Sequence, residues 1–280
     1  MKVLPFKIPK PEQEALVYQE DHEIIFYDQL HQHEEIQISF IVKGTGTLIV
    51  GDTINHYQEN DILVIGSNVP HVFKSDIELT SKSVMYTLFF TVDSFGKSFF
   101  GIPDFKEIDS FFKNAALGMK LTSNKDKIIE IFKTLSSQNK IERIASLLII
   151  INEILKSEFV ALSSFVYQKI YSDDEGKRMR AVFEHAMTHY NKNITLDEIA
   201  EKASMTKNAF CRYFKKRTNK TFFQFLIEIR IEHACKLLYK NPDMSIASIS
   251  DACGFQNITN FNRKFKELKQ VTPSQYRAQY

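Results

Sequence analysis

The sequence predicts an α+β chain of two parts, an N-terminal β-barrel with flanking helices and a C-terminal domain that is entirely helical. Short β-forming segments separated by turn residues recur between Glu20 and Val92, which is typical of a barrel or sandwich. From Asp104 onward, apolar residues recur at every third or fourth position, as amphipathic helices require. A length of 280 residues accommodates two domains of ordinary size.

The β-rich part is expected to contain several short strands, because segments rich in β-branched and aromatic residues alternate with turn residues. Turn pairs such as Gly51-Asp52 and Asn60-Asp61 separate these segments. The expected strands are Glu23–Tyr27, Ile36–Val42, Gly46–Val50, Ile62–Ile65 and Val84–Val92.

The helical remainder is divided by a polar segment. Before it lies a wide apolar stripe at helical spacing, formed by Ile144, Leu147, Leu148, Ile151 and Leu155. Such a stripe is wide enough to pack on the barrel, to form a dimer interface, or both. The polar run from Tyr171 to Gly176 predicts a linker. The expected boundaries are 1–103 for the barrel, 104–170 for a helical dimerisation and packing segment, 171–178 for the linker and 179–280 for the C-terminal domain.

Charge is distributed unevenly along the chain, although the net charge is only +2. Residues 176–280 carry 19 Lys and Arg against 9 Asp and Glu, whereas the first 175 residues carry 17 against 25. An acidic half joined to a basic half predicts that only the C-terminal half contacts a polyanion. Charge alone leaves DNA, RNA and an acidic protein open as that partner.

Composition argues against several classes of protein. The cysteines, Cys211, Cys235 and Cys253, contain no CxxC pair, which indicates reduced thiols and not a disulfide framework or zinc site. The longest apolar run, Leu147–Ile151, is far shorter than the roughly 20 residues of a membrane span. The N-terminus also lacks the apolar stretch of a signal peptide. We therefore expect a soluble cytoplasmic protein with no membrane partner.

A weak internal repeat lies in the basic half. One copy, TLDEIAEKASMTKNAFCRYFKK, starts at Thr195, and the other, SIASISDACGFQNITNFNRKFKE, starts at Ser245. Their apolar positions match when one extra residue is allowed in the second copy, before Phe261. Each copy predicts a short helix with a Thr or Ser N-cap, a tight turn of small residues and a second helix. Two helix-turn-helix units are therefore expected, at about residues 195–216 and 245–267.

The second helix of each unit is expected to turn its polar face outward. Arg and Asn suit guanine and adenine edges, whereas Lys suits phosphates. Between the units, Phe222–Lys240 predicts one stiff helix, which would hold the two outward faces about 34 Å apart, one turn of DNA. An ordinary helical bundle with a basic surface is the alternative, and two capped copies in tandem argue against it.

The region from about Met179 to Tyr280 resembles the DNA-binding domain of AraC/XylS-type regulators. The resemblance is carried by LDEIAEKASMTKNAFCRYFKK, by IEIRIEHACKLL and above all by SIASISDACGFQNITNFNRKFKELKQVTPSQYR, with small departures at Ser250 and Gln270. It implies a seven-helix domain that binds double-stranded DNA through two helix-turn-helix units. By position, the residues expected to contact bases are Asn208, Cys211, Arg212, Ile258, Thr259, Asn262 and Arg263, and those expected to contact phosphates are Lys207, Lys215 and Lys266.

The stretch LHQHEEIQISFIVKGTGTLIVGDTINHYQENDILVIGSNVPHVF resembles the cupin-like sensor domain often joined to such DNA-binding domains. This resemblance implies a small β-barrel that is open at one end. We expect a pocket for a small-molecule effector there, with a barrel filled by its own side chains as the alternative. The expected pocket residues are His31, His33, Gln37, Phe40, His71, Phe73 and Tyr86.

The histidines of this stretch resemble part of a metal site. Metal-binding cupins use an HxH pair, a Glu shortly after it and a distant His, and His31, His33 and His71 match those histidines. The carboxylate position falls on Gln37, a neutral amide and a poorer ligand for a divalent cation. Glu34 and Glu35 lie close by at the wrong spacing. We therefore expect no metal and no cofactor, and histidines that are structural or contact a ligand.

Together these patterns predict a sequence-specific transcription regulator and not an enzyme. We expect a homodimeric activator that contacts double-stranded DNA and RNA polymerase, with an effector that alters the spacing of the DNA-binding halves. A metal-dependent cupin enzyme with a helical appendage is one alternative. A non-specific nucleoid or RNA-binding protein is another, because phosphate contacts alone suffice for non-specific binding.

Overall fold

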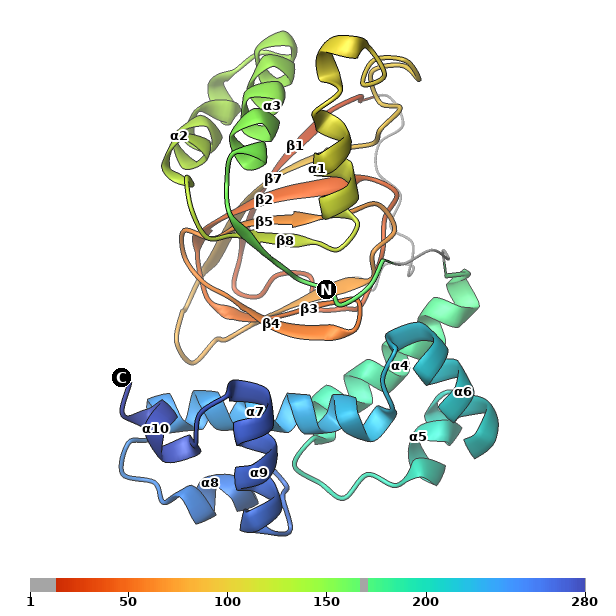
Figure 1. The fold of residues 1–280 in the computed structure, drawn as a ribbon, viewed down its shortest axis with the longest axis vertical. Helices are drawn as coiled ribbons and strands as arrows, with labels where there is room; N and C mark the ends of the chain where they lie inside the picture. Colours follow the sequence, from red (N-terminus) through yellow and green to blue (C-terminus); the bar gives the residue numbers. More distant parts are fainter. Residues whose placement is uncertain (1–13, 167–170, 280) are drawn as a thin grey trace. The chain divides into compact units, whose positions relative to one another are not determined.

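The computed structural model describes residues 14–166 and 171–279. The chain forms two compact units, Met1–Gly176 and Lys177–Tyr280. The first is built on β-strands with helices against one face of a sheet, and the second consists of helices joined by loops (Figure 1). The α+β organisation expected from the sequence is confirmed.

Two antiparallel sheets form the first unit, as a cupin-like domain requires. The larger sheet has the strand order β1-β7-β2-β5-β8-β9 and the smaller one β4-β3-β6. The strands are β1 (Val17–Glu23), β2 (Ile36–Lys43), β3 (Gly46–Val50), β4 (Thr53–Tyr57), β5 (Ile62–Ile65), β6 (His71–Ser75), β7 (Ser83–Phe90), β8 (Met119–Leu121) and β9 (Phe159–Ala161).

The first strand differs from the expectation. Glu23–Tyr27 was expected to form a strand, but β1 lies earlier, at Val17–Glu23. Among the strands of the described residues, β1 pairs only with β7, and an edge strand carries polar residues that an apolar pattern does not detect. Ile24 and Ile25 follow the strand and are exposed, while Phe26 is buried. The apolar run therefore marks the loop that enters the barrel and not a strand.

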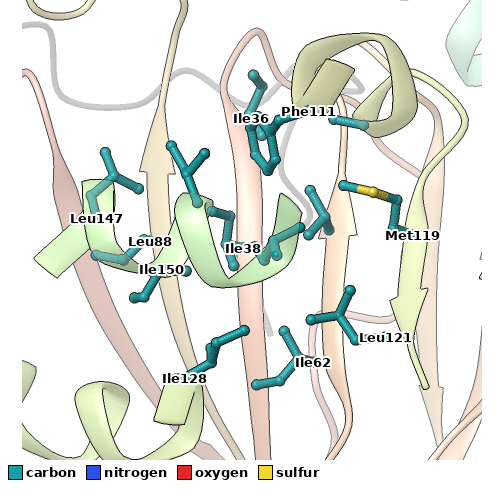
Figure 2. Packing of buried hydrophobic residues seen from close by; sticks show 14 of the residues in the cluster. Ile36, Ile38, Ile62, Leu88, Phe111, Met119, Leu121, Ile128, Leu147 and Ile150 are labelled. Atoms are coloured by element: carbon teal, nitrogen blue, oxygen red, sulfur yellow. The ribbon is translucent and has the colours of Figure 1, made fainter. Parts of the chain in front are cut away.

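Both faces of β2 are buried, which explains its apolar character. Ile36, Ile38 and Phe40 pack against helices, whereas Ile41 belongs to a separate cluster that contains residues of both sheets. The helices are α1 (Ile108–Ala115), α2 (Asp126–Thr134) and α3 (Lys140–Leu155), with short 3-10 turns at Pro103–Phe105 and Leu135–Ser137. Figure 2 shows Ile38, Ile62 and Leu88 of the sheet facing Ile128, Leu147 and Ile150 of the helices.

The apolar stripe of α3 is used within the first unit. Leu147 and Ile151 are fully buried, and Leu148 and Leu155 pack partly buried against the same cluster. Packing on the sheet, one of the two roles expected for this stripe, is therefore present. Ile141 and Ile149 on the same helix remain exposed.

Seven helices make up residues 171–279, the number that the family resemblance implies. They are α4 (Asp173–His189), α5 (Leu196–Lys202), α6 (Lys207–Thr218), α7 (Phe222–Lys240), α8 (Ile246–Ala252), α9 (Ile258–Lys269) and α10 (Pro273–Arg277). α5 packs with α6 and α8 with α9, while α7 packs against α6, α8, α9 and α10. The long helix α7 extends between the two pairs (Figure 1).

The expected linker at 171–178 is largely helical, because α4 begins at Asp173. Its polar residues are those of a helix N-terminus. The Glu175 N–H donates to Ser172 Oγ (3.3 Å), and the Ser172 N–H donates to Glu175 Oε2 (3.2 Å). This reciprocal pair and the acidic first turn stabilise a helix start. Composition alone does not distinguish such a start from a loop.

The turns between α5 and α6 and between α8 and α9 share one hydrogen-bond pattern. The Met205 N–H donates to the Ala200 carbonyl (2.9 Å), and the Phe255 N–H donates to the Ser250 carbonyl (3.1 Å). The residue before each donor is left-handed, with φ of 53° at Ser204 and 80° at Gly254. The two copies of the sequence repeat therefore form the same backbone turn, as expected.

Gly254→Ala is expected to destabilise the second unit by about 1–3 kcal/mol. A Cβ at Gly254 would lie within 2.8 Å of three backbone atoms of Asn191, which cannot rotate away as a side chain can. Ser204→Gly is the matched control and should change stability by no more than about 1 kcal/mol, because Ser204 already carries a Cβ in this conformation. Urea denaturation followed by circular dichroism measures both. A Gly254→Ala chain as stable as the native chain would contradict the prediction.

Candidate nucleic-acid interface and ligand cavity

α6 and α9 begin at side-chain N-caps, which define where each outward face starts. Thr206 accepts a hydrogen bond from the Ala209 N–H, and Asn257 accepts from the Thr259 and Asn260 N–H groups. Both helices end at a left-handed residue, Asn219 or Gln270. These caps satisfy N–H groups that a helix leaves without intrahelical partners, so each helix has a defined start and end.

Aromatic residues anchor the inner faces of both helices. Phe210 and Phe214 of α6 are fully buried, with ring centroids 5.6 Å apart, and Phe214 also contacts Phe222 of α7. In α9, Phe261 and Phe265 are fully buried, with centroids 5.7 Å apart. Residues four apart lie on one side of a helix, so these pairs force the opposite sides outward.

Every residue expected to contact DNA lies on an exposed face. The expected residues on α6 are all exposed: Lys207, Asn208, Cys211, Arg212 and Lys215. So are those on α9: Ile258, Thr259, Asn262, Arg263 and Lys266. Further exposed residues on these helices are Lys216, Asn260, Glu267 and Leu268. Ile258, at 42% exposure, is an apolar side chain at the start of the outward face, where a thymine methyl group offers a matching contact.

Two of these cations are engaged within the chain. Lys207 Nζ lies 2.7 Å from Asp197 Oδ2, in a pair whose side chains are both exposed. Arg263 donates to Asn260 Oδ1 (2.9 Å) and lies 3.6 Å from Glu267. Exposed ion pairs contribute only about 0–1 kcal/mol, so a phosphate or base can replace these partners at small cost.

Sequence reasoning missed Asn260 as a site residue. It is exposed in the first turn of α9, and its side-chain Oδ1 accepts a hydrogen bond from Arg263. The spacing of three residues on a helix places the two side chains together, so this signal was present in the sequence. Asn260 thereby orients Arg263.

The three cysteines differ in exposure. Cys211 is exposed on α6, whereas Cys235 and Cys253 are buried. Burial raises the pKa of both the Cys235 and the Cys253 thiol to about 12. These two thiols are therefore protonated at neutral pH and behave as small apolar core residues.

The loop between α4 and α5 links the two helix pairs of the second unit. Arg230 of α7 donates to the Tyr190 carbonyl (2.7 Å) and the Lys192 carbonyl (2.8 Å), and its guanidinium lies over the Phe255 ring. Asn191, between the two acceptors, is the residue that closely approaches Gly254. Contacts from α7 and from the α8–α9 turn thus converge on one loop.

A cavity of about 220 Å³ lies in the first unit. It is lined by Gln19, Asp21, Glu23, Phe26, Tyr27, His31, His33, Gln37, His71, Phe73, Met85 and Phe89. Among the residues expected in the pocket, His31, His33, Gln37, His71 and Phe73 are therefore brought together. Asp21 and Glu23 were missed, because they belong to the polar edge strand β1 that the sequence pattern did not detect.

Phe40 and Tyr86 do not line the cavity, contrary to expectation. They are directly opposite each other on β2 and β7 and pack with the helix-covered cluster. Side chains alternate between faces along a strand, so Gln37 and Phe40, three positions apart, must lie on opposite faces. Ser39 and Thr87 occupy the cavity face of these strands instead, and Gln37 donates to Ser39 Oγ (2.8 Å), which lies 3.0 Å from Thr87 Oγ1.

Backbone pairing brings the three histidines together. His31 and His71 exchange N–H to carbonyl hydrogen bonds of 3.1 and 2.9 Å across an isolated bridge. Their ring centroids lie 4.3 Å apart, and His33 lies 5.0 Å from His71. All three residues are buried. The expected clustering of these histidines is therefore observed.

Each of these rings is held by a backbone carbonyl. The Nδ1 atoms of His31, His33 and His71 lie 2.8 Å from the carbonyl oxygens of Gln29, Glu35 and Val69, respectively. A carbonyl only accepts, so Nδ1 carries the proton and donates in each ring. In a neutral ring of this tautomer, Nε2 carries the lone pair.

Two family models match the chain. A model described as an AraC-like ligand binding domain matches residues 15–90, and one described as a helix-turn-helix domain matches residues 199–279. The first match contains β1 to β7 and the cavity histidines. The second contains most of α5 and all of α6 to α10.

Several known regulators are similar to the chain. An uncharacterized regulator of Bacillus subtilis, YdeC, is 31% identical over 100 residues, which cover 36% of this chain and 34% of that protein. The Msm operon regulatory protein of Streptococcus mutans is 21% identical over 245 residues, covering 86% and 84%. The transcriptional activator RhaR of Mannheimia succiniciproducens is 24% identical over 257 residues, covering 90% and 87%. The similarity thus spans about a third of YdeC and most of the other two proteins.

Within residues 14–166 and 171–279, no helix has both the length and the apolar character needed to cross a membrane. The two family models match in the order of the two structural units, one to each. The chain therefore carries an AraC-like ligand binding domain followed by a helix-turn-helix domain, and it is similar over most of its length to regulators of the AraC type.

Proposed function

We propose that this chain is a transcription regulator that binds double-stranded DNA sequence-specifically through α6 and α9. The observation that carries the proposal is that α6 and α9 expose the same kinds of side chain on the same side of the helix. Each turns a buried Phe pair inward and exposes Asn, Arg and Lys on the opposite face. A helix of this kind fits the major groove.

Base contacts are assigned to the exposed amide and guanidinium groups. Asn208 and Asn262 match adenine, and Arg212 and Arg263 match guanine, because each pair forms two hydrogen bonds in the major groove. Cys211, Ile258 and Thr259 offer small or apolar contacts beside them. Lys207, Lys215 and Lys266 are assigned to phosphates, which position the protein without specifying sequence.

The connection between the pairs supports simultaneous binding. α7 has 19 residues and is therefore about 28 Å long. This length approaches the roughly 34 Å of one DNA turn, the separation at which two helices enter successive major grooves on one face. The convergence of Arg230 and Gly254 on the α4–α5 loop supports a fixed spacing.

Selection of bound sequences from a random DNA pool tests this function. The purified chain is expected to enrich two short half-sites about 10 base pairs apart, because one turn of B-DNA separates successive major grooves on one face. A non-specific nucleic-acid binder retains DNA without enriching any sequence. Retention without enrichment, or no retention, would contradict the proposal.

The first unit is proposed to sense a small-molecule effector in the cavity beside the histidines. An effector that binds one conformation better than another shifts their populations, and this shift would change DNA binding. The buried polar groups Gln37, Ser39 and Thr87 support a ligand with polar contacts. The match to a ligand binding domain supports the same role.

The proposal also includes a cellular location, an oligomeric state and a mode of regulation. The chain acts in the cytoplasm as a homodimer, and as an activator it contacts RNA polymerase. The similarity to RhaR, whose name describes an activator, supports activation. The exposed Ile141 and Ile149 on α3 support a dimer contact on that helix. Sedimentation equilibrium of the purified chain tests the dimer, and a monomer at all concentrations would contradict it.

A further inference from the structure

We propose that Gln32 and Asp52 attach the end of the first unit to the wall of the cavity, so that a change in the cavity alters how this part of the chain is held. We call residues 162–165 and 171–176 the exit segment, because the first unit ends at Gly176. The inference concerns regulation through the proposed effector cavity and to that extent rests on the proposed function. The attachment itself is measured without DNA and without an effector.

Gln32 lies between two cavity histidines and faces the other way. His31 and His33 line the cavity, whereas Gln32 does not, because side chains alternate between the two faces of an extended chain. Gln32 is fully buried, and its Nε2 donates to the carbonyl of Tyr171 (3.2 Å). One short stretch of chain thus contacts the cavity on one face and the exit segment on the other.

A single hydrogen bond holds the Gln32 amide. A carbonyl only accepts, so the amide nitrogen must be the atom that faces Tyr171. Within the described parts of the chain, Gln32 Oε1 is buried and accepts no hydrogen bond. Tyr171 is also buried, so water does not readily replace Gln32 as the donor to its carbonyl. A displacement of Gln32 therefore weakens a contact that has no substitute nearby.

Asp52 forms the second attachment. Its carboxylate is fully buried and accepts hydrogen bonds from Ser163 Oγ (3.0 Å), the Ser164 N–H (3.0 Å) and Ser164 Oγ (2.6 Å). The neighbouring Thr53 hydroxyl donates to the Leu162 carbonyl. The turn between β3 and β4 therefore holds the first part of the exit segment at several atoms.

The Asp52 attachment adjoins the third cavity histidine. Gly51 donates its N–H to the carbonyl of Pro70 (2.8 Å), the residue before His71. His71 exchanges two backbone hydrogen bonds with His31, which in turn precedes Gln32. Both attachments thus belong to the backbone that carries the histidines.

This connection gives the cavity a physical route to the exit segment. Packed interiors transmit displacement because they contain few voids that could absorb it. A molecule that moves His31 or His33 must also move Gln32, whose bond to Tyr171 is already at the long end of the usual range. Tyr171 lies two residues before α4, the helix that continues into the second unit. The state of the cavity therefore shifts the population of attached and released exit segments.

Hydrogen–deuterium exchange of the full chain, followed by mass spectrometry, tests the route. Phe89 lines the cavity, and its ring centroid lies 5.4 Å from that of His33. Phe89→Leu should speed exchange of residues 171–176 about fivefold, the effect of losing one hydrogen bond of ordinary strength. Phe90→Leu is the matched control, because Phe90 packs with the helix-covered cluster instead. It should leave exchange of residues 171–176 unchanged.

A double variant tests whether the effect passes through Gln32. Gln32→Met keeps the length of the side chain but removes the amide, and it should also speed exchange of residues 171–176 about fivefold. Adding Phe89→Leu to Gln32→Met should give no further increase, because the two changes act on the same contact. Gln58→Met, at an exposed glutamine, should have no effect. Asp52→Ala should speed exchange of residues 162–165.

Affinity for the selected DNA site measures the regulatory effect. Gln32→Met should strengthen DNA binding by the full chain about fivefold, the lower end of the usual coupling between sites. The physical reason is that a released exit segment restricts the orientation of the second unit less. Gln58→Met should leave the affinity unchanged.

The outcomes separate this inference from the proposed function. Equal exchange of residues 171–176 in Phe89→Leu and Phe90→Leu overturns it, as does a Phe89→Leu effect that persists in full beside Gln32→Met. If Phe89→Leu does not fold, unchanged or weaker DNA binding by Gln32→Met overturns it. A chain that selects DNA but shows none of these effects refutes the attachment route alone. A chain that shows the exchange effects but selects no DNA refutes the DNA-binding proposal alone.

Discussion

Arg212→Ala and Arg263→Ala should each weaken binding to the selected DNA site by about 1–3 kcal/mol, or about 5–150-fold. Both guanidinium groups extend from the exposed faces of α6 and α9. A guanidinium that donates twice to guanine loses both hydrogen bonds on truncation, and the base is left with two unsatisfied acceptors. Combining the two changes should cost about 2–6 kcal/mol if the helices act independently.

The pattern of loss separates base contacts from phosphate contacts. Each arginine variant should also relax the sequence preference at one position of the half-site. Lys215→Ala, on the same face of α6, should instead weaken binding to all sequences alike and reduce the salt slope by about one. Electrophoretic mobility shifts at several salt concentrations measure both effects.

Lys113→Ala is the matched control for charge. Lys113 is exposed on α1 in the first unit, and its removal lowers the net charge by the same amount. It should leave affinity and salt slope unchanged, because Lys113 belongs to the first unit and not to the helices assigned to DNA. Arginine variants that retain native affinity and an unchanged footprint would remove α6 and α9 as the recognition helices.

Phe214→Ala is expected to destabilise the second unit by about 3–5 kcal/mol, the usual cost of truncating a buried Phe. Its side chain is fully buried at 0% exposure. Four other rings, from Phe183, Phe210, Phe222 and Phe225, lie with centroids 5.6–6.2 Å from it. They come from α4, α6 and α7, so the truncation opens a cavity where three helices meet. Such a loss is a large fraction of the roughly 5–15 kcal/mol of a typical domain.

Phe223→Ala provides the matched control, since Phe223 is adjacent to Phe222 on α7 but 44% exposed. Its truncation should cost no more than about 1 kcal/mol. Urea denaturation followed by circular dichroism measures both variants, because the chain has no tryptophan to report unfolding by fluorescence. Equal stability of the two variants would show that α6 is not anchored by this cluster. DNA binding should fall with Phe214→Ala at temperatures where the unit unfolds.

Much of the surface that we propose to bind DNA could be located from the sequence, because the signals for its helices are local. A cap, the i and i+4 spacing of Phe210 and Phe214, and the outward position of Arg212 all lie within one helix. The pairing of the two copies, including the inserted residue, followed from the same local spacing. The start of α4 was missed because Ser172 and Glu175 form a cap that resembles a polar loop in composition.

The cavity was only partly predictable because it depends on pairings between distant segments. Alternation along β2 places Gln37 and Phe40 on opposite faces of the strand, so the expectation that both line one pocket was wrong. By contrast, no local pattern predicts that β1 borders the cavity or that Asp21 lines it together with the histidines. An edge strand with polar residues on both faces has no distinctive periodicity.

By itself, the amino-acid sequence determined the class of the protein: the basic helical half, the repeated helix pairs and their outward residues, since these depend on contacts a few residues apart. Only the tertiary structure decided that Asp21 and Glu23 of β1 line the cavity with the histidines and that Phe40 and Tyr86 pack under helices. The physical reason is strand register. Antiparallel pairing joins residues tens of positions apart, and a shift of one residue would turn each side chain to the other face.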